Sequence, residues 1–214
     1  REDPDTRPKA APRLQKTTLS EPPAPPRYAF LRTPFWDRAE PATQEAFTEL
    51  AEFLGANCVE EVLHEEFDRA ADYLRTIMYP DLAFALDRYF ENGADQISAI
   101  LTGMVEEGRA VTALDYNRAA SRVEPMNAWL ARIFEDYDAI LTLSTPGEAP
   151  VGLDATGDPI FCSTWSLLGT PAITLPLMQG EAGMPLGVQL VGERGDDARL
   201  LRTAQQLAAQ VAAG

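Results

Sequence analysis

The amino-acid sequence predicts an α/β fold. Two patterns of strands and helices support this prediction, and the amino-acid composition is compatible with it. The 214 residues are 45% hydrophobic, which is enough for one substantial core. A strand, a helix and a strand follow one another within residues 28–62, as in a βαβ unit with parallel strands. Near the carboxyl end, two apolar segments flank the short connection QGEAGMP, which is typical of an antiparallel hairpin. We therefore expect parallel and antiparallel strand pairs in one domain of about residues 28–214.

The first 27 residues differ from the rest of the chain, because they contain seven prolines and many charged residues. Such a segment maintains neither helical nor ladder hydrogen bonds for long. We interpret residues 1–27 as a proline-rich linker or an extended arm on the surface, with a disordered tail as the alternative.

The βαβ unit begins with the apolar and aromatic strand expected at residues 28–33. The helix over residues 41–54 has Pro41 in its first turn and Gly55 as its stop signal. The second strand is expected at residues 58–62.

The middle of the chain is expected to be helical, since apolar residues recur at intervals of three and four. Tyr79-Pro80 and Asn92-Gly93 interrupt the pattern. This predicts three short helices, over residues 67–78, 81–90 and 94–107. Thr112 is a suitable cap for a longer helix up to Tyr137, which Pro125 should kink or divide.

The last third alternates strands and helices again. Gly169 and the following Thr170-Pro171 end one helix and turn the chain into a strand. Asp196 or Asp197 is placed to accept hydrogen bonds from the first amides of the final helix. The expected order is strand 138–143, a Gly/Pro loop over 144–158, helix 159–168, strand 172–177, strand 187–191 and helix 197–211.

Charge and hydropathy argue against several classes of function. The formal net charge of −15 makes nucleic-acid binding through phosphate neutralisation unfavourable. No apolar run approaches the roughly 18 residues that cross a bilayer, and residues 1–27 lack the apolar centre of a signal peptide. We expect a soluble, cytoplasmic protein without nucleic-acid or membrane partners.

Metal and thiol chemistry are also disfavoured. The chain has one histidine, His64, whose polar neighbours indicate an exposed loop position. Cys58 and Cys162 are about a hundred residues apart, which fits no zinc pattern, and both are expected to be buried free thiols. The sequence predicts neither a metal site nor a cofactor.

Two motifs near the carboxyl end resemble the end of the amidase signature family, the serine amidases that use a lysine and two serines. They are GTPAITLP over residues 169–176 and PLGVQLVG over residues 185–192. The pairs Asp115-Tyr116 and Ala119-Ala120 also match that family's pattern, and the resemblance extends over about residues 1–211. It implies a mixed central sheet flanked by helices, and hydrolysis of a carboxamide through an acyl-enzyme.

In that family the catalytic lysine and the Gly/Ser-rich segment with both serines belong to the first half of the enzyme. Here the lysines are Lys9 and Lys16, both in the proline-rich segment. Ser144, Ser163 and Ser166 do not lie in a turn that would expose a hydroxyl beside oxyanion donors. We therefore expect a carboxy-terminal half with no catalytic residue of its own, inactive alone, whose partner is the missing amino-terminal half. Such a half would expose strand edges, and it could also form a homodimer.

The resemblance also places the helix that precedes Gly169 beside a pocket for a small amide. Phe161 and Trp165 would supply an apolar wall, and Thr164 and Asp158 polar contacts. Core packing, and helix capping by Asp158, are the structural alternatives. Tyr79, at the expected break beside Pro80, is a further pocket candidate.

Two other functions stay open. The amidotransferases of this family bind glutamine, and a basic group for its carboxylate is expected on the helix before the long one. Residues 96–108 contain no Lys or Arg, and Arg109 is the first, which favours a general amidase acting on neutral or apolar amides. The other alternative is a non-catalytic binding or assembly module derived from an amidase.

Overall fold

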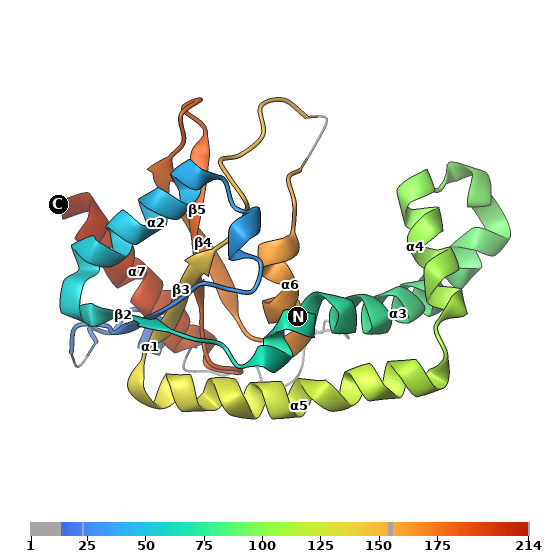
Figure 1. The fold of residues 1–214 in the computed structure, drawn as a ribbon, viewed down its shortest axis with the longest axis horizontal. Coiled ribbons are helices and arrows are strands. Elements are labelled where there is room, and N and C mark those ends of the chain that lie inside the picture. Colours follow the sequence, from blue (N-terminus) through green and yellow to red (C-terminus); the bar gives the residue numbers. More distant parts are fainter. Residues whose placement is uncertain (1–13, 23, 154–155, 214) are drawn as a thin grey trace.

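The computed structural model describes residues 14–22, 24–153 and 156–213, which form an α/β fold around a mixed five-stranded sheet (Figure 1). The strand order is β2-β1-β3-β5-β4. Strands β2, β1 and β3 are parallel, whereas β5 is antiparallel to both β3 and β4. The predicted combination of a parallel unit and an antiparallel hairpin is therefore confirmed. The strands are β1 Tyr28–Leu31, β2 Cys58–Glu61, β3 Ala139–Leu143, β4 Ala172–Gln179 and β5 Pro185–Val191.

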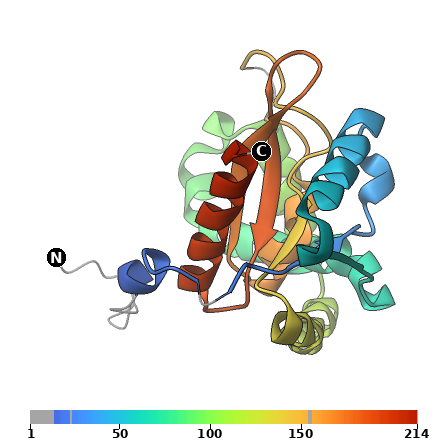
Figure 2. The same cartoon turned by 90° about the vertical axis from the view of Figure 1, so that its left-hand side faces the viewer.

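Helices cover both faces of the sheet (Figures 1 and 2). One face packs against α2 and α7, and the other packs against α6 and parts of α3 and α5. Both faces of β1 and β3 are therefore buried, which explains why these strands are apolar without alternation. The helices are α1 Leu14–Thr18, α2 Pro41–Leu54, α3 Ala70–Gly93, α4 Ala99–Ala110, α5 Ala113–Asp136, α6 Ile160–Leu168 and α7 Asp197–Ala213.

The segment before the sheet is partly described. Residues 1–13 lie outside the described residues, and residues 14–18 form the short helix α1, which packs against α7 (Figure 2). Arg202 of α7 donates a hydrogen bond to Ser20 over 3.2 Å. Part of the proline-rich segment therefore lies along the body of the protein.

The predicted helix signals at the termini are confirmed. Pro41 begins α2, and Gly55 ends it with a φ of 56°. Gly169 ends α6 with a φ of 64°, the left-handed conformation that glycine adopts without strain. Thr112 accepts a hydrogen bond from the amide of Asp115 over 3.1 Å, and Asp196 accepts one from the amide of Arg199 over 3.4 Å.

The predicted break at Tyr79-Pro80 is wrong, because α3 continues through Pro80 to Gly93. Proline removes one helical hydrogen bond and is unfavourable in a helix interior. Here α4 packs against α3 at this point, and a methyl group on Gly108 would lie 2.1 Å from the carbonyl oxygen of Tyr79. Close packing of the two helices thus supports α3 where its own hydrogen bonding is interrupted. Similarly, Pro125 does not divide α5.

Residues 80–118 form a projecting element that we call the arm, composed of the outer half of α3, α4 and the start of α5 (Figure 1). Within this range, all of which the structure describes, three residues are buried: Ala83, Val105 and Gly108. The side chains of Phe84 and Ile100 are 88% and 80% exposed. The arm therefore has almost no core of its own.

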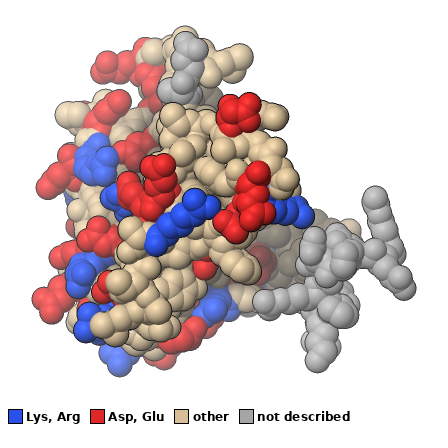
Figure 3. All heavy atoms as spheres, turned by 90° about the vertical axis from the view of Figure 1, so that its right-hand side faces the viewer, with Lys and Arg blue, Asp and Glu red and all other residues tan. Residues whose placement is uncertain are grey.

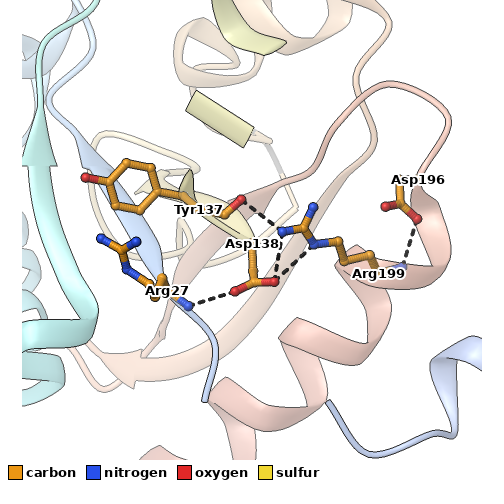
Figure 4. A network of polar contacts seen from close by, with 5 residues as sticks. All are labelled: Arg27, Tyr137, Asp138, Asp196 and Arg199. Carbon is orange, nitrogen blue, oxygen red and sulfur yellow. Dashed lines mark hydrogen bonds and ion pairs between the residues drawn. The ribbon is translucent and has the colours of Figure 1, made fainter. Parts of the chain in front are cut away.

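A polar network joins the starts of β1 and β3 to α7 (Figure 4). The Asp138 carboxylate accepts hydrogen bonds from the amide of Arg27 over 2.9 Å and from Arg199 Nε over 3.0 Å. Arg199 also donates to the carbonyl of Tyr137 over 3.3 Å. We call Arg27, Asp138 and Arg199 the clasp, because they connect three segments that are distant in sequence.

None of the described helices is both long enough and apolar enough to span a membrane.

Candidate functional site

A row of polar side chains crosses the sheet on the face that carries α6. Thr142 of β3, Gln189 of β5 and Thr174 of β4 are paired directly across neighbouring strands. Thr142 and Gln189 are buried, whereas Thr174 is exposed. The row therefore runs from the interior of the protein to its surface at the β4 edge.

Hydrogen bonds hold this row in place, as buried polar groups require. Thr142 Oγ1 donates to the carbonyl of Leu31 over 3.0 Å. Gln189 Nε2 donates to the carbonyl of Leu143 over 2.7 Å and to that of Phe161 over 3.4 Å. With both amide protons directed at carbonyls, Gln189 ties α6 to the sheet, and none of the described residues donates to its Oε1.

The row opens into a groove of about 550 Å³ between α6 and the β4 edge, which we call the polar groove. Trp165 forms part of its wall and is 2% exposed. The indole Nε1 of Trp165 has no acceptor among the described residues. The groove is lined by Cys162, Trp165, Ser166, Gly169, Thr170, Pro171, Ala172, Thr174, Gln189, Gly195 and Asp197.

The groove carries little charge, since Asp197 is the one carboxylate among the described residues that line it. Cys162 donates a weak hydrogen bond to the carbonyl of Ser144 over 3.5 Å, and burial raises the pKa of its thiol. A raised pKa keeps this cysteine protonated at neutral pH, so it is a poor nucleophile. The lining therefore suits a neutral group with hydrogen-bonding capacity, such as an amide.

The predicted pocket residues on and before α6 fall into different environments. Trp165 lines the polar groove. Phe161 and Thr164 are each 1% exposed, so they support the groove wall from within the core. Asp158 accepts a hydrogen bond over 3.0 Å from the amide of Ile160, the first residue of α6, and pairs with Arg38, although the cap residue of the helix is Pro159. Asp158 also lines a separate surface hollow of about 410 Å³.

Tyr79 lies on α3 at the base of the arm, outside the lining of the polar groove. The guanidinium of Arg75 lies over its ring, 5.4 Å from the ring centroid. The structure thus brings Phe161, Thr164 and Trp165 together on α6, with Asp158 just before it, and keeps Tyr79 on another helix.

Of the three serines considered above, two donate hydrogen bonds to backbone carbonyls and one is exposed. Ser144 is buried and donates to the carbonyl of Gly187 over 2.9 Å, and Ser163 donates to the carbonyl of Pro159 over 3.4 Å. Ser166 is exposed in the groove lining. Lys16 is exposed on α1, which packs against α7, and Lys9 lies outside the described residues.

The cysteines and the histidine occupy peripheral positions. Cys58 and Cys162 are free, but they are partly rather than fully buried, because they lie on an edge strand and beside the groove. His64 is exposed, as expected, and accepts a hydrogen bond from the amide of Glu66 over 3.2 Å. Among the described residues, no group of three or more His, Cys, Asp and Glu could hold a metal ion.

Sequence reasoning did not identify Gln189 as a site residue. Its signal was available, since glutamine interrupts the apolar strand GVQLV. A buried glutamine needs partners for its amide, and its position opposite Thr142 and Thr174 depends on strand register.

Comparison with curated proteins gives relatives of about twice this length or more. A 2-amino-5-chloromuconic acid deaminase from Comamonas testosteroni is 28% identical over 213 residues, covering 90% of this chain and 46% of the relative. A subunit of the glutamyl-tRNA(Gln) amidotransferase from Cupriavidus necator is 34% identical over 142 residues, covering 61% of this chain and 28% of the relative. The chain thus spans about half or less of the length of the curated relatives it matches.

Solved structures share the fold. A crystal structure of an amidase superposes with a TM-score of 0.77 at 24% identity, over 90% of this chain and 47% of the other. A 6-aminohexanoate cyclic dimer hydrolase superposes with a TM-score of 0.73 at 22% identity, over 99% of this chain and 50% of the other. A family model described as Amidase matches residues 1–201. Together with the motifs around Gly169 and Gly187, these matches show that the chain belongs to the amidase signature family.

Proposed function

We propose that this chain is the carboxy-terminal half of an amidase that hydrolyses a carboxamide to a carboxylate and ammonia or an amine through an acyl-serine intermediate. The amino-terminal half would supply the lysine-activated serine, the bridging serine and the oxyanion donors, as the family resemblance implies. This half would supply part of the sheet and a wall of the substrate pocket. Alone, it would be inactive.

The polar groove is the observation that carries this proposal. Small-molecule sites are largely apolar, with a few directed polar groups, and an amide substrate needs donors and acceptors within such a wall. Trp165 and Gln189 offer this combination at an open edge of the sheet. We assign Trp165 to the pocket wall, and Phe161 and Thr164 to the residues that support this wall. We assign Asp158 to the amino-terminal end of the same helix, and Tyr79 to the surface that faces the arm.

Two measurements test the proposal. In the reading frame upstream of Arg1, we expect a lysine followed by a Gly/Ser-rich turn with two serines. The complete protein should release ammonia from neutral carboxamides, whereas the 214-residue chain should not. Hydrolysis by the 214-residue chain at a rate similar to that of the complete protein would contradict the division of roles.

A glutamine-dependent amidotransferase is the second candidate, favoured by the 34% identity to the amidotransferase relative. Arg109, the first basic residue after residue 96, is not free to bind the carboxylate of glutamine. It pairs with Asp87 over 2.9 Å and stacks on Phe90 at 5.6 Å. We therefore expect glutamine to be hydrolysed more slowly than an apolar amide. Preference for glutamine would establish the second candidate, and amide binding without turnover would indicate a non-catalytic module.

A further inference from the structure

Helix α3 ends at the pair Asn92-Gly93, where the chain turns towards α4 in the arm (Figure 1). Asn92 is exposed, and Gly93 is partly exposed. The sequence contains four asparagines, and Asn92 is the one that a glycine follows. The other three precede Cys58, Arg118 and Ala128. The Asn-Gly pair has a reactivity that the proposed amidase function does not use.

The reaction of such a pair is deamidation through a cyclic imide. The backbone nitrogen of the glycine attacks Cγ of the asparagine and closes a five-membered ring. The C–N bond of the side-chain amide breaks, and its nitrogen leaves as ammonia together with the proton of the glycine amide. Water then opens the ring at either carbonyl, which gives aspartate or isoaspartate. Glycine favours the attack, because it has no Cβ that would crowd the nitrogen.

The attacking nitrogen belongs to the last turn of α3, so the reaction requires only this turn to open. Gly93 has a φ of −176° and precedes the short 3-10 turn Ala94–Gln96, which ends the regular helix. Terminal turns open at a free energy near zero, whereas core helices open only with large parts of the protein. The arm adds little resistance, because it has almost no core of its own.

Asn127 shows the opposite arrangement in the body of the protein. It lies in the interior of α5, and its Nδ2 donates to the carbonyls of Val123 and Leu168, each over 3.1 Å. The contact between α5 and α6 and the helix itself must both open before this side chain reacts. Asn92 Nδ2 donates to the carbonyl of Arg88 over 2.6 Å, within its own terminal turn. Asn127 is therefore an internal comparison for Asn92.

We propose that Asn92-Gly93 is a site of spontaneous deamidation, and that conversion of Asn92 to aspartate or isoaspartate loosens the arm. The new carboxylate cannot donate to the Arg88 carbonyl, and it lies at the carboxyl end of α3, where the helix dipole disfavours negative charge. Glu91 and Asp95 already place negative charge beside it. Isoaspartate also lengthens the main chain between α3 and α4 by one methylene. This proposal does not depend on the proposed function.

Peptide mapping of the complete protein, after incubation near neutral pH, tests the proposal. Trypsin releases residues 89–109 and residues 123–132, which contain Asn92 and Asn127 respectively. The first peptide should give two products of the deamidated mass that separate by chromatography. It should convert at least about tenfold faster than the second peptide, because its turn opens more often. Equal rates at the two asparagines would overturn the proposal.

Two glycine variants sharpen the test. Gly93→Ala keeps Asn92 and should slow its conversion at least about tenfold, because the added Cβ crowds the attacking nitrogen. That Cβ would meet no atom closer than Gln96 Nε2, at 3.4 Å, so the turn retains its fold. Gly103→Ala, in α4 of the same arm, should change the rate by less than about threefold. Equal rates in the two variants would overturn the attack by the Gly93 nitrogen.

Hydrogen exchange in α4 measures the effect on the arm. After conversion, the α4 amides of the wild-type protein should exchange at least about threefold faster, and those of equally incubated Gly93→Ala should not. Conversion without faster exchange would overturn the loosening of the arm. Conversion in a synthetic peptide of residues 89–109 but not in the protein would show that the fold protects the pair, and would overturn the site.

Discussion

The sheet-containing body and the arm are stabilised in different ways. In the body, every residue of β1 and β3 is buried between two helical layers. In the arm, residues 80–118 bury two small or medium side chains and one glycine, and they leave Phe84, Ile100 and Leu114 exposed. Since apolar burial dominates folding free energy, the body holds most of the described core, and the arm depends on what it contacts.

Polar contacts do not make up this difference. Arg109 with Asp87 and Arg75 with Glu107 link the arm helices, but all four side chains are at least half exposed. Exposed pairs of this kind contribute about 0–1 kcal/mol. Figure 3, which looks at the molecule from the arm side, shows acidic and basic side chains interspersed over this face. The arm is therefore the region most sensitive to a missing partner surface.

Removing a large side chain from each region should give the largest contrast. Phe47→Ala, in the core of the body, should lower the free energy of unfolding by about 3–5 kcal/mol, because it leaves a cavity. Phe84→Ala, in the arm, should change it by less than about 0.5 kcal/mol. Urea unfolding measures both. Comparable losses would show that the arm contributes to the cooperative core.

The clasp offers a second contrast. Asp138→Ala should cost about 1.5–3 kcal/mol, because Arg27 and Arg199 lose charge-assisted hydrogen bonds that connect β1, β3 and α7. The control Glu124→Ala removes the exposed partner of Arg194 and should cost less than about 1 kcal/mol. Thermal unfolding compares the two. An equal loss of stability in the two variants would show that the clasp contributes no more than an ordinary surface ion pair.

A methyl group at the contact of α3 and α4 should act mainly on the arm. Gly108→Ala would place Cβ 2.1 Å from the carbonyl oxygen of Tyr79, so the helices must separate, at a cost of about 1–3 kcal/mol. Gly103→Ala changes a glycine of the same helix whose added Cβ would meet no atom within 4 Å. This substitution should stabilise α4 by about 0.5–1 kcal/mol. Hydrogen exchange in α4 should rise in the first variant and fall in the second. Faster exchange throughout the sheet would show that arm and body unfold together.

A rise to alkaline pH should have the smallest effect of these changes on the free energy of unfolding near neutral pH. A hydrogen bond to Glu61 and burial raise the pKa of Tyr137 to about 12, and burial raises that of Cys58 to about 11. The unfolded chain loses these protons first, so their stabilisation is complete below about pH 8 and is lost as pH rises from about 9 to 12. Denaturant unfolding from pH 7 to 11 measures the decline. Tyr137→Phe should make it shallower, whereas Tyr89→Phe, at an exposed position of the arm, should not.

Local sequence signals predicted most of the fold. Pro41, Gly55, Gly169 and Thr112 mark helix ends because capping and left-handed glycine depend on neighbouring residues only. Pro80 was misleading for the opposite reason. Its helix is supported by α4, and the space for that contact exists because residue 108 is glycine.

The candidate site was less predictable. Trp165 was predicted as a pocket residue from its helix and from the family motif, and it lines the polar groove. Gln189 was not predicted, because its surroundings depend on the pairing of strands far apart in sequence. Phe161 and Thr164 look like pocket residues on a helical wheel, but their exposure depends on how α6 lies on the sheet.

By itself, the sequence determined the family, the α/β class, the order of the elements and the signals at their ends, since all of these depend on composition, spacing and residues adjacent in the chain. The tertiary structure alone decided that α3 passes through Pro80, that Thr142, Gln189 and Thr174 form one row, and that the row opens at the β4 edge of the sheet. The physical reason is that strand register and helix contact join segments separated by tens of residues. No local propensity encodes which of them meet.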